Sequence, residues 1–193
     1  ADGTTFAENV VNSGSFNADG STFNGEVDNS GTFTAVDTAF ASVSNANAGA
    51  FNVNAGVGWD TLSNEGTLNL NADTTIGSQN ATANTGTINV DGTLTVESAA
   101  NLGGTVNVNA GAELKVTGNG AGFETVVNSG LVEVTGNGEM TIAKLNNGEQ
   151  GAASTLKASG NGVAKVTDSI NAEGEEIDTI YGKIVKLDDG KII

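Results

Sequence analysis

One short pattern recurs along the chain and limits its fold more than any other feature does. The tripeptide Asn-x-Gly, followed by apolar residues at alternating positions, begins at Asn12, Asn29, Asn47, Asn64, Asn84 and Asn128. The glycines of these corners, with a Gly103-Gly104 variant, follow one another at intervals of 17 to 20 residues as far as Gly104. A repeat of fixed length in this range predicts a solenoid in which each repeat forms one coil.

Each repeat contains two short apolar segments, and both alternate with polar residues. Ile88-Asn89-Val90 and Leu94-Thr95-Val96 show the pattern most clearly. Alternation with a period of two is typical of a β-strand with one buried face, and no comparable stretch has the period of a helix. The sequence therefore predicts an all-β fold, a parallel β-helix or β-solenoid with about 17–20 residues per coil.

Equivalent residues of successive coils should form columns inside such a solenoid. We expect one interior column to contain Phe16, Phe33, Phe51, Leu68, Ile88, Val106 and Val132. We expect the other to contain Phe6, Phe23, Phe40, Ile76, Leu94, Leu114 and Met140. Because six of the seven phenylalanines precede residue 52, aromatic stacking should stabilise the first coils and aliphatic packing the later ones.

The Asn-x-Gly corners should be equally regular. Asparagine and glycine accept the backbone conformations of tight turns, and asparagine amides in adjacent coils can hydrogen-bond to one another. The predicted structural asparagine ladder consists of Asn12, Asn29, Asn47, Asn64, Asn84 and Asn128.

The last part of the chain departs from the repeat. From Val163 onward the Asn-x-Gly pattern is lost and isoleucine is frequent. We therefore divide the chain into a β-solenoid over residues 1–162 and a C-terminal segment over residues 163–193, which either caps the solenoid or pairs with a neighbouring subunit. The sequence Asp188-Asp189-Gly190 predicts a turn, and thus a hairpin or two short strands, between Lys183 and Ile193.

Charge is distributed unevenly along the chain. Seven lysines, without arginine or histidine, face 23 acidic residues, for a net charge of −16, and all the lysines follow residue 114. Head-to-tail contact would bring the lysine-bearing end of one copy to the acidic end of another, and such contacts build fibres. The candidate interface residues are Phe6, Phe16, Phe23, Ile184, Leu187, Ile192 and Ile193. The alternative is that acidity only keeps a repetitive β-protein soluble.

The same composition argues against several functions. Nucleic acids and anionic membranes bind clustered cations, and no apolar run approaches the roughly 20 residues of a membrane span. Without cysteine, histidine or arginine, the chain has no thiol nucleophile, no Ser-His-Asp triad and no zinc site with Cys or His ligands.

Paired carboxylates could still serve general acid and base catalysis. The pairs are Asp188-Asp189, Glu175-Glu176 and Glu26 with Asp28, and solvated surface pairs are the simpler interpretation. We therefore expect no enzyme and no cofactor, with weak Ca²⁺ bridging between acidic residues as the open alternative.

The repeats Asn-Ser-Gly-Thr-Phe, Asn84–Val96 and Asn128–Val134 resemble the passenger regions of bacterial autotransporters and similar secreted β-helical surface proteins. The likeness covers roughly residues 10–145. It implies a right-handed coil, a location outside the bacterial cell, and a role in adhesion, aggregation or surface structure.

Together these observations favour a secreted, non-enzymatic structural protein of the bacterial surface or extracellular matrix. We expect it to associate with itself head to tail into a filament, without binding nucleic acid or inserting into a membrane. The alternative is an adhesin segment that binds glycans or proteins of a host or of neighbouring cells through a lateral face. Complementary ends would favour the filament, and an exposed patch on one face would favour the adhesin.

Overall fold

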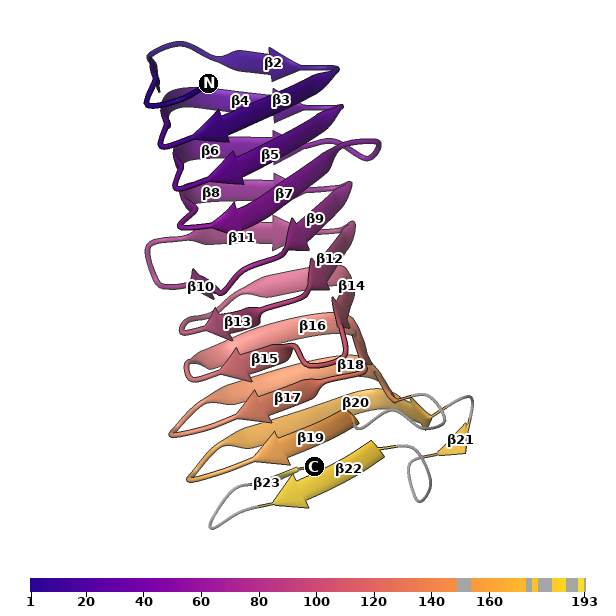
Figure 1. Ribbon diagram of the computed structural model, residues 1–193. Helices are drawn as coiled ribbons and strands as arrows, with labels where there is room; N and C mark the ends of the chain where they lie inside the picture. Colours follow the sequence, from indigo (N-terminus) through magenta and orange to yellow (C-terminus); the bar gives the residue numbers. More distant parts are fainter. Residues whose placement is uncertain (149–153, 173–174, 177–181, 187–190, 193) are drawn as a thin grey trace.

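The chain forms one stack of parallel β-strands. The computed structural model describes residues 1–148, 154–172, 175–176, 182–186 and 191–192. The chain winds through about 8 turns of roughly 19 residues, and strands pair in parallel from each turn to the next. N-terminal and C-terminal residues lie at opposite ends of the stack (Figure 1). The described residues contain no helix, so the predicted all-β solenoid is confirmed.

The first seventy residues form narrow coils. Their strands are β1 (Thr5–Phe6), β2 (Val10–Asn12), β3 (Ser15–Asp19), β4 (Thr22–Asn29), β5 (Thr32–Val36), β6 (Ala39–Asn45), β7 (Ala50–Ala55), β8 (Gly58–Asn64) and β9 (Thr67–Leu70). The strands β1, β2, β4, β6 and β8 stack on one face, which we call face 1. The strands β3, β5, β7 and β9 stack on face 2.

A third strand joins each turn from residue 74 onward. The strands of this part are β10 (Thr74–Ile76), β11 (Ala81–Asn84), β12 (Thr87–Val90), β13 (Thr93–Val96), β14 (Asn101–Val108), β15 (Glu113–Val116), β16 (Asn119–Asn128), β17 (Leu131–Val134), β18 (Glu139–Asn147), β19 (Ser154–Ala158), β20 (Val163–Ala172), β21 (Glu175–Glu176), β22 (Gly182–Lys186) and β23 (Lys191–Ile192). Face 3 is a separate six-stranded sheet of β10, β13, β15, β17, β19 and β22.

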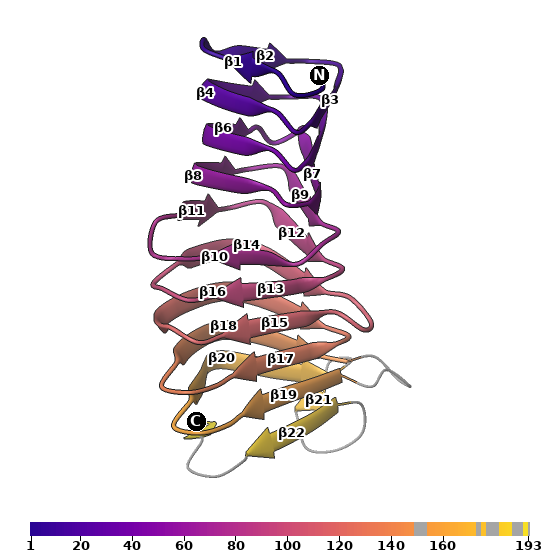
Figure 2. The same ribbon diagram turned by 60° about the vertical axis from the view of Figure 1, so that its left-hand side comes forward.

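The first two faces continue past the point where face 3 begins. β11 extends face 1 and β12 extends face 2, whereas the longer strands β14, β16, β18 and β20 cover both faces. Figure 2 shows that the stack is wider where face 3 is present. The solenoid therefore has a narrow N-terminal section and a wide C-terminal section.

Phenylalanine rings fill the narrow coils. In the column of Phe6, Phe23 and Phe40, successive rings are stacked with centroids 4.5 and 4.9 Å apart. In the column of Phe16, Phe33 and Phe51, the distances are 4.9 and 5.4 Å. The two columns meet edge to face at 5.4 to 6.0 Å. The aromatic part of the predicted core is confirmed.

Beyond the narrow coils the predicted columns are only partly right. Ile88 and Val106 continue the column of Phe16 and Leu68, as expected. Four other residues assigned to the columns lie on face 3 instead: Ile76, Leu94, Leu114 and Val132. The column of Phe16 continues from Val106 to Val126, and Met140 pairs with Ala121 and Ala164. The error arises because the third strand gives each later turn an additional apolar segment.

The described strands beyond residue 162 continue the stack. β20 pairs in parallel with β18, β22 with β19, and β23 with β20. Between Lys183 and Ile193 the structure thus has two short strands that pair with preceding coils. The predicted turn at Asp188-Asp189-Gly190 lies outside the described residues.

Candidate functional site

The asparagine ladder lies at the corner between faces 1 and 2. Its members are Asn12, Asn29, Asn45, Asn64 and Asn84, all buried. The amide nitrogen of each donates to the amide oxygen of the next, at 2.6 to 2.8 Å. Every buried side-chain nitrogen or oxygen atom in the described residues has a hydrogen-bond partner. The ladder therefore stabilises the corner and offers no free buried group to a ligand.

Of the six predicted ladder positions, Asn47 is wrong and Asn128 belongs to a different ladder. Asn47 is exposed, and Asn45 takes its place, because Asn45 precedes Gly49 by 4 residues whereas Asn64 precedes Gly66 by 2. Asn128 is in register with Val108 of face 2, and it begins a second ladder with Asn147 at 2.7 Å.

A further asparagine ladder, which was not predicted from the sequence, runs along the outer surface of face 2. Asn69 donates to Asn52, Asn89 to Asn69 and Asn107 to Asn89, at 2.7 to 2.8 Å. Each of these asparagines lies between the two apolar residues of an alternating strand, which is the signal that could have revealed the column. The amides of face 2 therefore bind one another along the rod.

Face 3 carries a line of charges on successive strands. Nζ of Lys157 lies 2.7 Å from Oε1 of Glu133, and Nζ of Lys115 lies 4.0 Å from Oε2. Burial raises the pKa of Glu133, but hydrogen bonds from Lys157 and Ser159 and the charges of both lysines outweigh it, so the pKa lies below its ordinary value. Glu133 is therefore held in its ionised form by the two lysines. An ionised carboxylate has no proton to donate, so Glu133 is better explained as part of a structural ion pair than as a catalytic acid.

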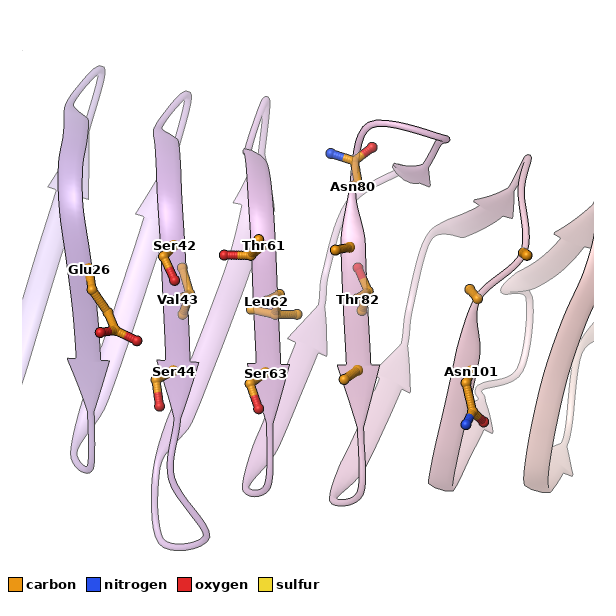
Figure 3. Close-up of a pocket in the computed structure, with 14 residues that line it drawn as sticks. Glu26, Ser42, Val43, Ser44, Thr61, Leu62, Ser63, Asn80, Thr82 and Asn101 are labelled. Carbon is orange, nitrogen blue, oxygen red and sulfur yellow. The ribbon is translucent and has the colours of Figure 1, made fainter.

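The outer surface of face 1 has a shallow hollow of about 500 Å³. Figure 3 shows its polar lining, which includes Glu26, Ser42, Ser44, Thr61, Ser63 and Asn101. The hydroxyl groups of Ser42, Ser44 and Ser63 have no hydrogen-bond partner among the described residues. Face 1 thus differs from face 2, where the outward amides are already paired.

The N-terminal edge of the stack contains two of the candidate interface phenylalanines. Phe6 and Phe16 are half-buried there, whereas Phe23 is only 1 % exposed because the rings of the other two cover it. Phe23 therefore cannot contact another copy. Val11, 76 % exposed, is the one large apolar side chain classed as exposed among residues 1–148 and 154–168.

The candidate interface residues of the C-terminal end are placed only in part. Ile184 belongs to β22 and Ile192 to β23, the final strands of the stack. Leu187 and Ile193 lie outside the described residues.

The structure places the candidate carboxylate pairs only in part. Glu26 and Asp28 both lie on β4, Glu175 and Glu176 form β21, and Asp188 and Asp189 lie outside the described residues. Among the described residues no three acidic side chains come close enough to hold a metal ion. The described residues also contain no helix that could cross a membrane.

Comparison with protein-family models, curated proteins and solved structures finds no significant match. The parallel strand pairing of the chain itself therefore places it among β-solenoid proteins.

Proposed function

We propose that this chain is a structural β-solenoid protein of the bacterial exterior whose copies join end to end. The observation that carries the proposal is the open edge of the first coil. β1 and β2 pair only with β4 in the described residues, whereas β4 and β6 have strand partners on both sides. The unpaired backbone groups of a strand edge form a ready template for a strand of another molecule.

Side chains at the same edge support the proposal. Val11 is exposed, and Phe6 and Phe16 are half-buried, so a further coil would remove apolar surface from water. All seven lysines follow residue 114, in the C-terminal part of the chain, and four of them follow β19. Joining unlike ends would bring these cations toward the acidic N-terminal coils.

Sedimentation velocity and negative-stain electron microscopy over a concentration series test this function. We expect rods that lengthen as protein concentration rises. Val11→Lys should suppress the growth, because a charge at a strand edge opposes pairing. Thr75→Lys adds the same charge to the middle of the rod, at an exposed position of β10, and should leave growth unchanged. Single rods at every wild-type concentration would refute end-to-end association.

The hollow on face 1 favours a second candidate function, adhesion through neutral glycans. Serine hydroxyls and the Asn101 amide can both donate and accept hydrogen bonds, as sugar hydroxyls do. The acidic residues of the first 114 positions, which include no base, would repel anionic chains. The proposed ligand is therefore an uncharged oligosaccharide lying along the face.

Titration with neutral oligosaccharides, followed by NMR shifts of the backbone amides, tests this second function. We expect shifts around Ser42 and Ser63. Ala83→Arg, which places a large side chain at an exposed position of face 1, should abolish them, and Thr75→Arg on face 3 should not. Unchanged spectra with all oligosaccharides would exclude binding at the hollow.

A further inference from the structure

Two regular columns of side chains run along the outer surface of face 2. Strand register places in the first column Ser15, Thr32, Ala50, Thr67, Thr87, Thr105 and Thr125. It places in the second column Asn17, Thr34, Asn52, Asn69, Asn89, Asn107 and Val127. The strands β9, β12 and β14 repeat the same Thr-x-Asn pair in unbroken register. Face 2 therefore presents a two-dimensional array of hydroxyl and amide groups.

The threonine hydroxyls of the first column are free. Those of Thr32, Thr67, Thr87, Thr105 and Thr125 have no hydrogen-bond partner among the described residues. All five side chains are at least partly exposed. A hydroxyl group can donate one hydrogen bond and accept two, so this column offers evenly spaced donors and acceptors to whatever covers it.

The asparagine ladder holds the second column in place. Asn52 donates to the hydroxyl oxygen of Thr34 at 3.3 Å, and the later asparagines continue the ladder at 2.7 to 2.8 Å. An amide within the ladder uses one N–H and one lone pair, which leaves a second N–H and a second lone pair available. Side-chain ladders also favour a flat sheet. The array is therefore ordered before any ligand arrives, which lowers the entropic cost of binding.

The two columns are uncharged, although the chain contains 23 acidic residues. Charged residues such as Asp91 lie beside the columns, and Lys144 follows Thr125 only at the C-terminal end of the first. The columns also contain no aromatic side chain, on which sugar rings would stack. The array thus suits a neutral ligand that forms hydrogen bonds and has a regular repeat of its own.

The spacing of the array selects among such ligands. Neighbouring strands of a sheet lie about 4.8 Å apart, and residues two positions apart on one strand lie about 6.7 Å apart. Both distances are close to repeat distances of the oxygen lattice of ice. We propose that face 2 binds the surface of ice crystals, whose water molecules bond to the free hydroxyls and amides. The inference is independent of end-to-end association, because face 2 runs along each single molecule.

Slow growth of ice in a solution of the chain tests this inference. A growing crystal excludes ordinary solutes and incorporates a protein that binds its surface, so the protein content of the ice is measured. Wild type should be enriched in the ice. Thr87→Lys should be incorporated about tenfold less, because its ammonium group would stand above the array and lose water at the crystal surface. Thr105→Lys, in the next coil, should have the same effect, and circular dichroism shows whether each variant is folded.

Thr93→Lys is the matched control. Thr93 is also a partly exposed threonine of the same turn, but it belongs to β13 on face 3 and is in register with Glu113. T93K should enter the ice as wild type does.

Three outcomes would overturn the inference. The first is exclusion of wild type from the ice. The second is incorporation of folded T87K and T105K at the wild-type level, which would place ice binding on another face. The third is binding of wild type to insoluble cellulose while ice excludes it, which would indicate a solid polysaccharide as the ligand. A chain that enters ice but stays monomeric would refute end-to-end association and support this inference.

Discussion

The ring of Phe6 lies over the ring of Phe23, with centroids 4.5 Å apart and planes 6° from parallel. Phe23 is covered on its other side by Phe40 at 4.9 Å, and Phe6 is the first ring of the column. Each later ring of this column is therefore shielded by the ring of the preceding coil. The contribution of a ring to stability should depend on its position in the column more than on its type.

Phe23→Ala should lower the free energy of unfolding by about 3–5 kcal/mol, because it empties a fully enclosed site. Phe6→Ala should cost clearly less, since its ring is half-buried and stacks on one neighbour in its column. Denaturant titration followed by circular dichroism measures both. Equal losses for the two variants would contradict this account of the core.

Asn45→Ala should destabilise the chain by about 1–3 kcal/mol, because the buried amide oxygen of Asn64 loses its donor. Asn47→Ala removes the same side chain from an exposed position, and should change stability by less than about 0.5 kcal/mol. The two residues lie in one turn, so each is the control for the other. A larger effect at Asn47 would show that the ladder follows the Asn-x-Gly pattern after all.

Glu133 should make stability depend on pH. Its folded pKa lies below the ordinary value of 4.5, so its contribution is present above pH 4.5 and is lost as the pH falls through the folded pKa. Glu133→Gln should be less stable than wild type at pH 7, and the difference should shrink below pH 4.5. Unfolding by denaturant at a series of pH values measures it.

Glu113→Gln is the matched control for this pH series. It removes a charge from the adjacent strand β15, and Glu113 has no ion pair in the described residues. A gap between wild type and E133Q that stays constant from pH 7 to well below 4.5 would contradict the ion-pair interpretation.

The sequence predicted the coil and its aromatic core because both depend on local signals. Alternation defines each strand, and repeat length defines which strands can stack. The third face was not predicted, since Leu94 and Leu114 show the same alternation as Leu68 and Ile88 although they belong to a different sheet. Only hydrogen bonding between coils distinguishes these columns.

In the candidate site, too, the features with a local sequence signal were predicted and those set by pairing between coils were not. Asn12, Asn29, Asn64 and Asn84 were found from the Asn-x-Gly pattern, because turn and ladder coincide there. Asn45 was missed because its turn is longer, and the ladder follows strand register when the two signals disagree. The hollow on face 1 depends on side chains from strands far apart in sequence, which no local pattern brings together.

Face 3 begins at β10, whose only strand partner in the described residues is β13. The narrow coils are therefore joined to the wide coils through faces 1 and 2 alone. A thin flat section bends easily across its short dimension, whereas a three-sided section resists bending in every direction. In a filament of copies joined end to end, flexible narrow sections would alternate with stiff wide sections. Such a filament would bend at regular intervals, at the narrow sections, when it is sheared.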